Sequence, residues 1–150
     1  MKKFASLFHD LDSMTKTNER LDRLITYFES ACPKDSIWVC WFLSGNRIKG
    51  AIKTGELRSF LSEKVNLPIW LIEECHDRVG DLAETISLLA GSSSMNKSIS
   101  LDETIRGFLL PLRAMETEER KITLYRAWDQ LSIDEMLPFH KLLTGGFRMG

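Results

Sequence analysis

Apolar residues along this chain recur at steps of three and four, which is the spacing of one face of an α-helix. Thr17 offers an N-cap for the clearest case, and Pro33 follows soon after its end. The apolar positions of that segment are Leu21, Leu24, Ile25 and Phe28. The strict alternation that marks half-buried strands is almost absent. The pattern therefore predicts an all-α fold.

Capping residues, prolines and glycines mark the ends of further helices. The segments they bound are Asp35 to Gly45, Thr54 to Val65, Pro68 to Gly80, Asp81 to Gly91, and about Glu116 to Leu131. Two Ser-x-x-Glu capping boxes, Ser100 with Glu103 and Ser132 with Glu135, start two more helices. The total is about seven to nine helices in a compact domain. No repeat of fixed period is present, which argues against a helical solenoid.

One segment is apolar on nearly every side. Between Asp35 and Gly45 the apolar residues are Ile37, Trp38, Cys40, Trp41 and Phe42. A helix without a polar face is typically central, so we expect this one in the middle of the fold, with a buried strand as the competing interpretation. Trp38 and Trp41 are expected in the core, although an aromatic platform for stacked bases is the alternative.

Length and composition fit one folded domain. The chain has 150 residues, 43% hydrophobic and 27% charged, close to the average of soluble folded proteins. Residues 91–100 include the polar stretch SSSMNKSIS, which we interpret as an exposed loop joining two helical halves of a single domain, 1–150. Each half is too small to form a stable hydrophobic core alone.

The compartment follows from the apolar runs and the cysteines. No run reaches the length of a bilayer span, and the start MKKFASLFHDLDSM carries acids where a signal peptide is apolar. Cys32, Cys40 and Cys75 form no CxxC pair and have no histidines at ligand spacing, so neither a disulfide framework nor a zinc site is indicated. We expect a cytoplasmic protein with no membrane partner, in which the cysteines are small buried hydrophobes.

Net charge restricts any contact with nucleic acid to a local patch. The chain has 20 Lys and Arg against 21 Asp and Glu, a net charge of −1, and a pI of about 6.3. The segment 45–59 concentrates basic residues around the single acid Glu56, whereas 101–120 is rich in acids. Its basic residues are Arg47, Lys49, Lys53 and Arg58. Such asymmetry is typical of a one-sided binding face, with a solvated loop as the alternative.

Catalytic motifs are missing from the sequence. The chain contains no GxxxxGK[ST], HExxH or GxSxG pattern, and no Lys-x-Asp-Gly of a nucleotidyl transferase. Its histidines, His9, His76 and His140, are scattered over different helices, where a lone histidine is normally a hydrogen-bonded or solvated residue. The sequence therefore predicts a chain that binds without a catalytic site and without a cofactor of its own.

Two motifs resemble a known family. The stretch Gly80 to Glu84 reads GDLAE, and residues 142–150 read LLTGGFRMG. Both resemble the best-marked motifs of the N-terminal DNA-binding domain of bacterial ATP-dependent DNA ligases. Supporting matches are Thr17-Asn18, Tyr27-Phe28, and Leu112-Arg113 ahead of the helix with Trp128. In order and spacing, the resemblance covers essentially the whole chain.

The resemblance implies a non-catalytic domain that grips nicked duplex DNA through the phosphate backbone and the minor groove. It implies a role in DNA repair, replication or recombination. It also implies an adenylation domain and an OB-fold domain elsewhere in the parent ligase, absent from this chain, where ATP and Mg²⁺ would be used. The main alternative is a helical protein-interaction module that binds no nucleic acid. An independent enzyme is a third interpretation, which no cluster of residues supports.

The resemblance and the residues together suggest a phosphate-binding turn. We expect Thr144, Gly145, Gly146 and Arg148 to form it after the helix that Ser132 begins. Glycine tolerates the positive φ needed just past a helix. If φ is positive at Gly146, replacing that residue with valine should strain the turn and destabilise the domain. Arg148 should be exposed and able to bridge phosphate oxygens, while Arg47, Lys49 and Lys53 supply the other basic contacts. A plain helix C-cap is the alternative. Asp81 is expected to be an N-cap rather than a DNA contact, because phosphate repels a carboxylate.

Overall fold

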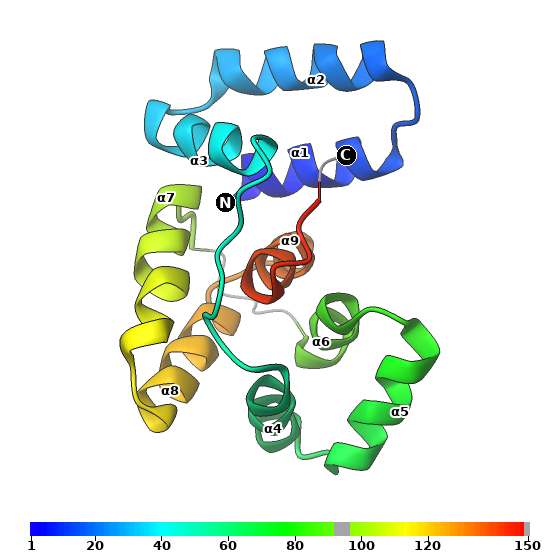
Figure 1. The fold of residues 1–150 in the computed structure, drawn as a ribbon, viewed down its shortest axis with the longest axis vertical. Coiled ribbons are helices and arrows are strands. Elements are labelled where there is room, and N and C mark those ends of the chain that lie inside the picture. The colour runs from blue at the N-terminus through cyan, green and yellow to red at the C-terminus, as the bar shows by residue number, and fades with distance from the viewer. Residues whose placement is uncertain (92–96, 149–150) are drawn as a thin grey trace.

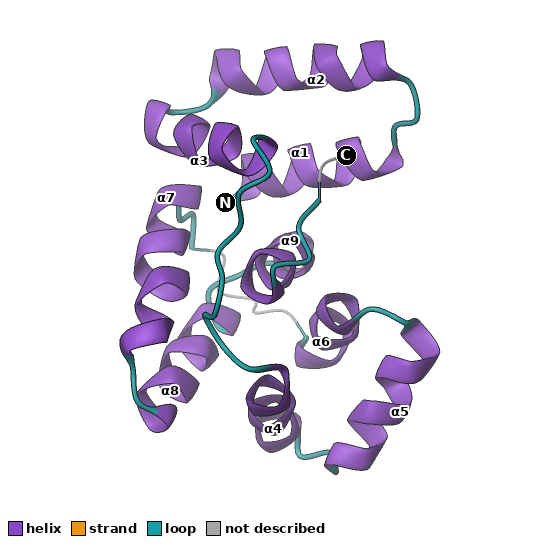
Figure 2. Ribbon diagram, viewed as in Figure 1, coloured by secondary structure: helices purple, strands orange, loops and turns teal. Residues whose placement is uncertain are grey.

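All regular structure is helical in the computed structural model, which describes residues 1–91 and 97–148 (Figure 2). Over these residues the α-helices are α1 (Lys2–Ser13), α2 (Thr17–Ser30), α3 (Pro33–Leu43), α4 (Thr54–Val65), α5 (Ile69–Val79), α6 (Leu82–Ala90), α7 (Leu101–Thr104), α8 (Thr117–Trp128) and α9 (Ile133–Thr144). A π-helical turn, η1 (Ile105–Leu109), and a 3₁₀ turn, η2 (Leu110–Ala114), extend α7. The all-α prediction is confirmed. Residues 92–96 of the predicted loop lie outside the described residues.

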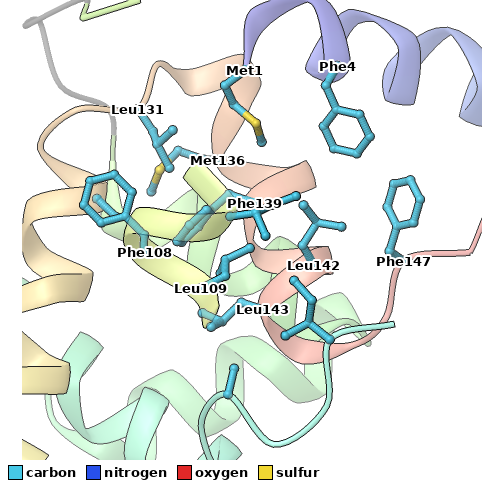
Figure 3. Close-up of a cluster of buried hydrophobic side chains, with 14 of the residues drawn as sticks. Met1, Phe4, Phe108, Leu109, Leu131, Met136, Phe139, Leu142, Leu143 and Phe147 are labelled. Carbon is cyan, nitrogen blue, oxygen red and sulfur yellow. The ribbon is translucent and has the colours of Figure 1, made fainter. Parts of the chain in front are cut away.

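The last helix, α9, occupies the centre of the fold (Figure 1). It packs against α1 on one side and against α6 on the other. Helices α2 and α3 lie with α1 at one end, whereas α4 and α5 lie with α6 at the other. Figure 3 shows the core around α9, where Met136, Phe139, Leu142 and Leu143 are at most 2% exposed. Both parts of the chain therefore contribute to one core.

Most helix ends follow the local signals in the sequence. Both predicted capping boxes form, with the Glu103 N–H donating to the Ser100 hydroxyl at 3.0 Å and the Ser132 N–H donating to the Glu135 carboxylate at 2.8 Å. Gly80 adopts the left-handed conformation that ends α5. These caps depend on residues within four positions, which explains why the sequence predicts them.

Two predicted caps are wrong. Helix α2 is preceded by Lys16, so Thr17 is its first helical residue. Helix α3 begins at Pro33, because proline fits the first helical position, and Asp35 lies inside its first turn. The carboxylate of Asp35 instead accepts hydrogen bonds from the backbone N–H groups of Leu101 and Asp102, at 3.2 and 2.9 Å. Asp35 thus caps a different helix, α7.

The prediction that the segment after Asp35 is central is also wrong. It is a helix, not the alternative strand, but α3 lies at the surface and buries fully only Val39 and Phe42. Ile37 is 68% exposed and Trp41 is 36% exposed, so Trp41 is not a core residue, and Trp38 is only half-buried. Composition indicated that this helix has no polar face, but it did not indicate which neighbours would cover it.

The cysteines were predicted to be buried, and this is wrong too. Cys32 and Cys40 belong to the start and the outer side of α3 and are exposed, while Cys75 on α5 is half-buried. Each therefore takes its exposure from the peripheral position of its helix. The three thiols are free.

His140 lies in the core of α9 and is fully buried. The indole N–H of Trp128 donates to its Nε2 at 2.8 Å, so this nitrogen carries no proton. The ring proton therefore sits on Nδ1, which lies 2.9 Å from the Ser87 hydroxyl. That hydroxyl donates in turn to the carbonyl of Ala83 at 2.6 Å. The neutral imidazole thus joins α6, α8 and α9, and burial lowers its pKa to about 3.

Candidate nucleic-acid interface

The candidate interface begins at the turn that follows α9. Gly145 has a φ of +70°, and its N–H donates to the carbonyl of Leu142. The N–H of Phe147 donates to the carbonyl of Lys141 at 3.1 Å, which folds the chain back over the end of the helix. This is the glycine-ended helix terminus that the sequence predicts.

Phe147 anchors this turn in the core. Its ring lies 5.4 Å from that of Phe4, 5.6 Å from that of Phe8 and 5.4 Å from that of Phe42. Figure 3 shows the rings of Phe147 and Phe4 turned toward each other. Because Phe147 is held inside, the next residue, Arg148, is placed at the surface, where it is exposed as predicted.

The loop between α3 and α4 passes directly over the turn. Ile48 is buried in this loop, and the residues on either side of it, Arg47 and Lys49, are exposed. A β-carbon added at Gly145 would lie 3.7 Å from Cδ of Arg47 and 3.8 Å from the carbonyl oxygen of Ile48. Two segments about a hundred residues apart in the sequence are therefore in contact.

A shallow hollow of about 170 Å³ opens where they meet. It is lined by Phe42, Gly45, Asn46, Arg47, Gly145, Phe147 and Arg148. Arg148 also lines a second hollow of about 150 Å³, together with Phe8, Leu11, Asp12, Met14 and Arg20. We name the set of Arg20, Arg47 and Arg148 the arginine site. Its members come from α2, from the loop after α3 and from the closing turn.

The arginine site is positive. Among the described residues, Arg20, Arg47 and Arg148 form no salt bridge with an acidic side chain. Asp12 is the one acid lining either hollow. Guanidinium groups of this kind can bind phosphate oxygens in a bidentate manner. The glycines bring backbone close to the same surface.

A family model described as DNA ligase N terminus matches residues 1–150. The chain belongs to the DNA ligase N-terminal domain family. This confirms the resemblance seen in GDLAE and LLTGGFRMG, without deciding whether the parent ligase is bacterial. No curated protein matches the chain. Within the described residues, no helix of this ligase domain is long and apolar enough to cross a membrane.

The neighbouring lysine of the ligase domain is neutralised. Lys141 forms a 2.5 Å salt bridge with Asp81, whose other carboxylate oxygen accepts the Glu84 N–H at 2.9 Å. Partial burial alone would raise the pKa of Asp81, but these hydrogen bonds outweigh it and hold the pKa below its usual value. Asp81 is therefore the predicted N-cap, and it also fixes the side chain of Lys141 beside the turn.

The other predicted site residues lie around this centre but do not line the two hollows. Lys49 is exposed on the loop, and Lys53 is exposed at its far end, where it precedes α4. The hydroxyl of Thr144 donates to the carbonyl of His140 at 2.8 Å, so its proton is used in a bond within α9. Gly146 is exposed, and its φ is not positive, so the position where a side chain would be strained is Gly145 and not Gly146.

Arg20 was not predicted as part of the interface. Its surroundings, TNERLDRL, carry equal numbers of acids and bases, so no local excess of charge marks it. Arg23, one turn further along, pairs with Asp10 of α1. The packing of α2 on α1 gives the two arginines different surroundings. Arg23 is paired, whereas Arg20 lines the hollow beside Arg148.

Alanine at Gly145 is expected to destabilise the domain by roughly 1–2 kcal/mol, because a β-carbon is unfavourable at positive φ. The matched change Gly146→Ala should stay within about 0.5 kcal/mol, since the nearest atoms to its added β-carbon lie at ordinary contact distances. Urea unfolding of both variants measures the difference. Equal destabilisation by the two alanines would contradict this description of the turn.

Proposed function

We propose that this chain is the non-catalytic DNA-binding domain of an ATP-dependent DNA ligase and that it binds nicked duplex DNA through the phosphate backbone and the minor groove. It serves DNA repair, replication or recombination in the cytoplasm. Membership of the ligase N-terminal family supports this proposal. The observation that carries it is the meeting of Arg47 and Arg148 at a glycine turn, with no salt bridge to an acidic side chain of the described residues.

The chemistry of the arginine site suits phosphate rather than bases. A ligase must act on any sequence, so its contacts should go to the backbone, which carries no sequence information. Both hollows are shallow, and three arginines from separate segments spread their charge along a surface instead of gathering it in one deep pocket. An extended row of phosphates fits such an arrangement.

The rest of the reaction belongs to the parent protein. In this proposal the adenylation domain is the intramolecular partner, and ATP and Mg²⁺ act there, with no cofactor bound by this chain. This division of labour agrees with the sequence, which has no Lys-x-Asp-Gly to accept AMP. Lys49 and Lys53 extend the basic surface from the arginine site toward α4.

Binding to DNA should depend steeply on salt. We expect the chain to bind labelled nicked and intact duplexes of unrelated sequence and to lose affinity roughly fortyfold between about 50 and 200 mM salt, as three phosphate contacts predict. Fluorescence anisotropy with each duplex at both salt concentrations measures this loss. No binding at the lower salt concentration would favour the alternative, a protein-interaction module without nucleic-acid binding.

A further inference from the structure

A second feature of the surface has no lining residue in common with the two hollows of the arginine site. An open groove of about 420 Å³ runs between α3 and the helical segment of α7, η1 and η2. It is lined by Lys34, Ile37, Trp38, Trp41, Asp102, Arg106 and Leu110. Three of its large apolar side chains are well exposed, Ile37 by 68%, Leu110 by 44% and Trp41 by 36%. So much apolar surface in one place is typical of an interaction site.

The groove is held in one shape before anything binds. Asp102 accepts the indole N–H of Trp38 at 2.7 Å and the guanidinium N–H of Arg106 at 2.7 Å, and both bonds lower the pKa of its carboxyl. Arg106 also lies over the ring of Trp38, 5.6 Å from its centre. Asp35 joins the two walls by capping α7 from α3.

The wall opposite α3 has unusual backbone geometry. The N–H of Leu110 reaches back five residues to the carbonyl of Ile105, and Pro111 has no N–H to continue a regular ladder. π-helical turns of this kind are rare and occur often at functional sites. Here the turn contains Arg106 and ends just before Leu110, the two groove residues that follow Asp102.

The charges around the groove indicate what it would bind. Lys34 and Arg106 are both exposed, whereas Asp102 is 8% exposed and is already paired with Arg106. Among the described residues Lys34 has no salt bridge, so the side chains that line the groove have a net positive charge. A partner would therefore need apolar side chains for the floor and acids for the rim. A second copy docked symmetrically through the same groove would bring two positively charged surfaces together, which like charges disfavour.

Two other modes of recognition fit poorly. Stacked bases need open, parallel ring faces, but Trp38 and Trp41 stand at 89° to each other and Arg106 covers the ring of Trp38. An added β-strand needs the free backbone edge of a sheet, but both walls of the groove are helical. A helix that lays its apolar side into the groove fits the chemistry that remains.

We propose that this groove is a docking site for an acidic amphipathic helix of another polypeptide. Bulky apolar side chains on one side of that helix fill the space between Trp41 and Leu110, and its flanking carboxylates pair with Lys34 and Arg106. The proposal is independent of DNA binding, since the groove shares no lining residue with the arginine site.

The test uses the whole chain and a fluorescein-labelled peptide of about fourteen residues, with leucines at helical spacing and glutamates between them. A control peptide, called its twin below, has the same sequence with lysine in place of each glutamate. We expect saturable binding of the acidic peptide and at least about tenfold weaker binding by Trp41→Ala. Lys34→Glu should weaken binding of the acidic peptide and strengthen binding of its twin. Trp70→Ala is the matched control, because Trp70 is 66% exposed on α5, outside the groove.

Nuclear magnetic resonance can show where on the domain the peptide binds. The indole N–H signals of Trp38 and Trp41 should shift on titration, while those of Trp70 and Trp128 stay unchanged. Equal binding of both peptides, no saturable binding, or shifts centred on Trp70 would each overturn the proposal. So would a dimer seen by sedimentation, or binding of single-stranded DNA, if Trp41→Ala abolished it.

Discussion

Alanine at both Arg47 and Arg148 is expected to weaken binding to every duplex sequence about a hundredfold at low salt, since each charge-assisted contact contributes roughly 1.5 kcal/mol. Two fewer phosphates would be neutralised, so the slope of log affinity against log salt should fall by about two. Both side chains are exposed, and thermal stability should therefore be unchanged. Salt-dependent anisotropy titrations measure both effects.

The matched control removes the same charge elsewhere. Arg78 on α5 and Arg126 on α8 are exposed arginines outside the arginine site, and their double alanine variant should keep nearly full affinity. The affinity of Arg20→Ala for duplex DNA should lie between those of the two double variants. If the Arg47 and Arg148 variant binds as well as the control, the closing turn is only structural, and the binding face must be sought near Lys49 and Lys53.

Acidification from pH 7 to pH 5 is expected to destabilise the domain by about 2 kcal/mol through His140 alone. The unfolded chain protonates this ring near its ordinary pKa of 6.5, whereas the folded chain does so only near 3. Unfolding is thus favoured progressively as pH falls between these values, and nothing is lost above 6.5. The main physical reason is burial, which disfavours the charged ring. In addition, Nε2 already accepts the N–H of Trp128, so a second ring proton would face another donor.

The comparison with His140→Gln isolates this effect from the carboxylates that also titrate in acid. Glutamine cannot gain a proton in this range, so the variant should lose about 2 kcal/mol less than the parent between the two pH values, whatever its starting stability. Urea unfolding at each pH measures the difference. An identical pH dependence in both proteins would mean that His140 is protonated in the folded state as readily as in the unfolded chain.

The fold was predictable where neighbouring residues decide the outcome. The capping box of Ser100 and Glu103 and the glycine cap at Gly80 each depend on residues only a few positions apart. Both helix ends form as predicted. The exposure of α3 was not predictable, because Trp41 and Cys40 have the composition of a core helix. Which of its sides is covered depends on α7, more than fifty residues away.

The candidate site divides in the same way. Arg47 and Arg148 could be selected separately, one from a local excess of basic residues and the other from a family motif that follows a helix. Their contact across Gly145 is a property of the packed molecule. Arg20 had no such signal, because its charge is balanced by neighbouring acids in the sequence, and only the packed structure shows that it lines a hollow with Arg148 while Arg23 pairs with Asp10.

The cap that Asp35 places on α7 has a consequence for the order of folding. The four residues of α7 are too few to be stable alone, and two of their first N–H groups find their acceptor on α3. Asp35 precedes those groups by 66 and 67 positions, so this long loop must close before these two bonds can form. The first turn of α7 is therefore coupled to the docking of α3, and the two walls of the groove are joined through these bonds.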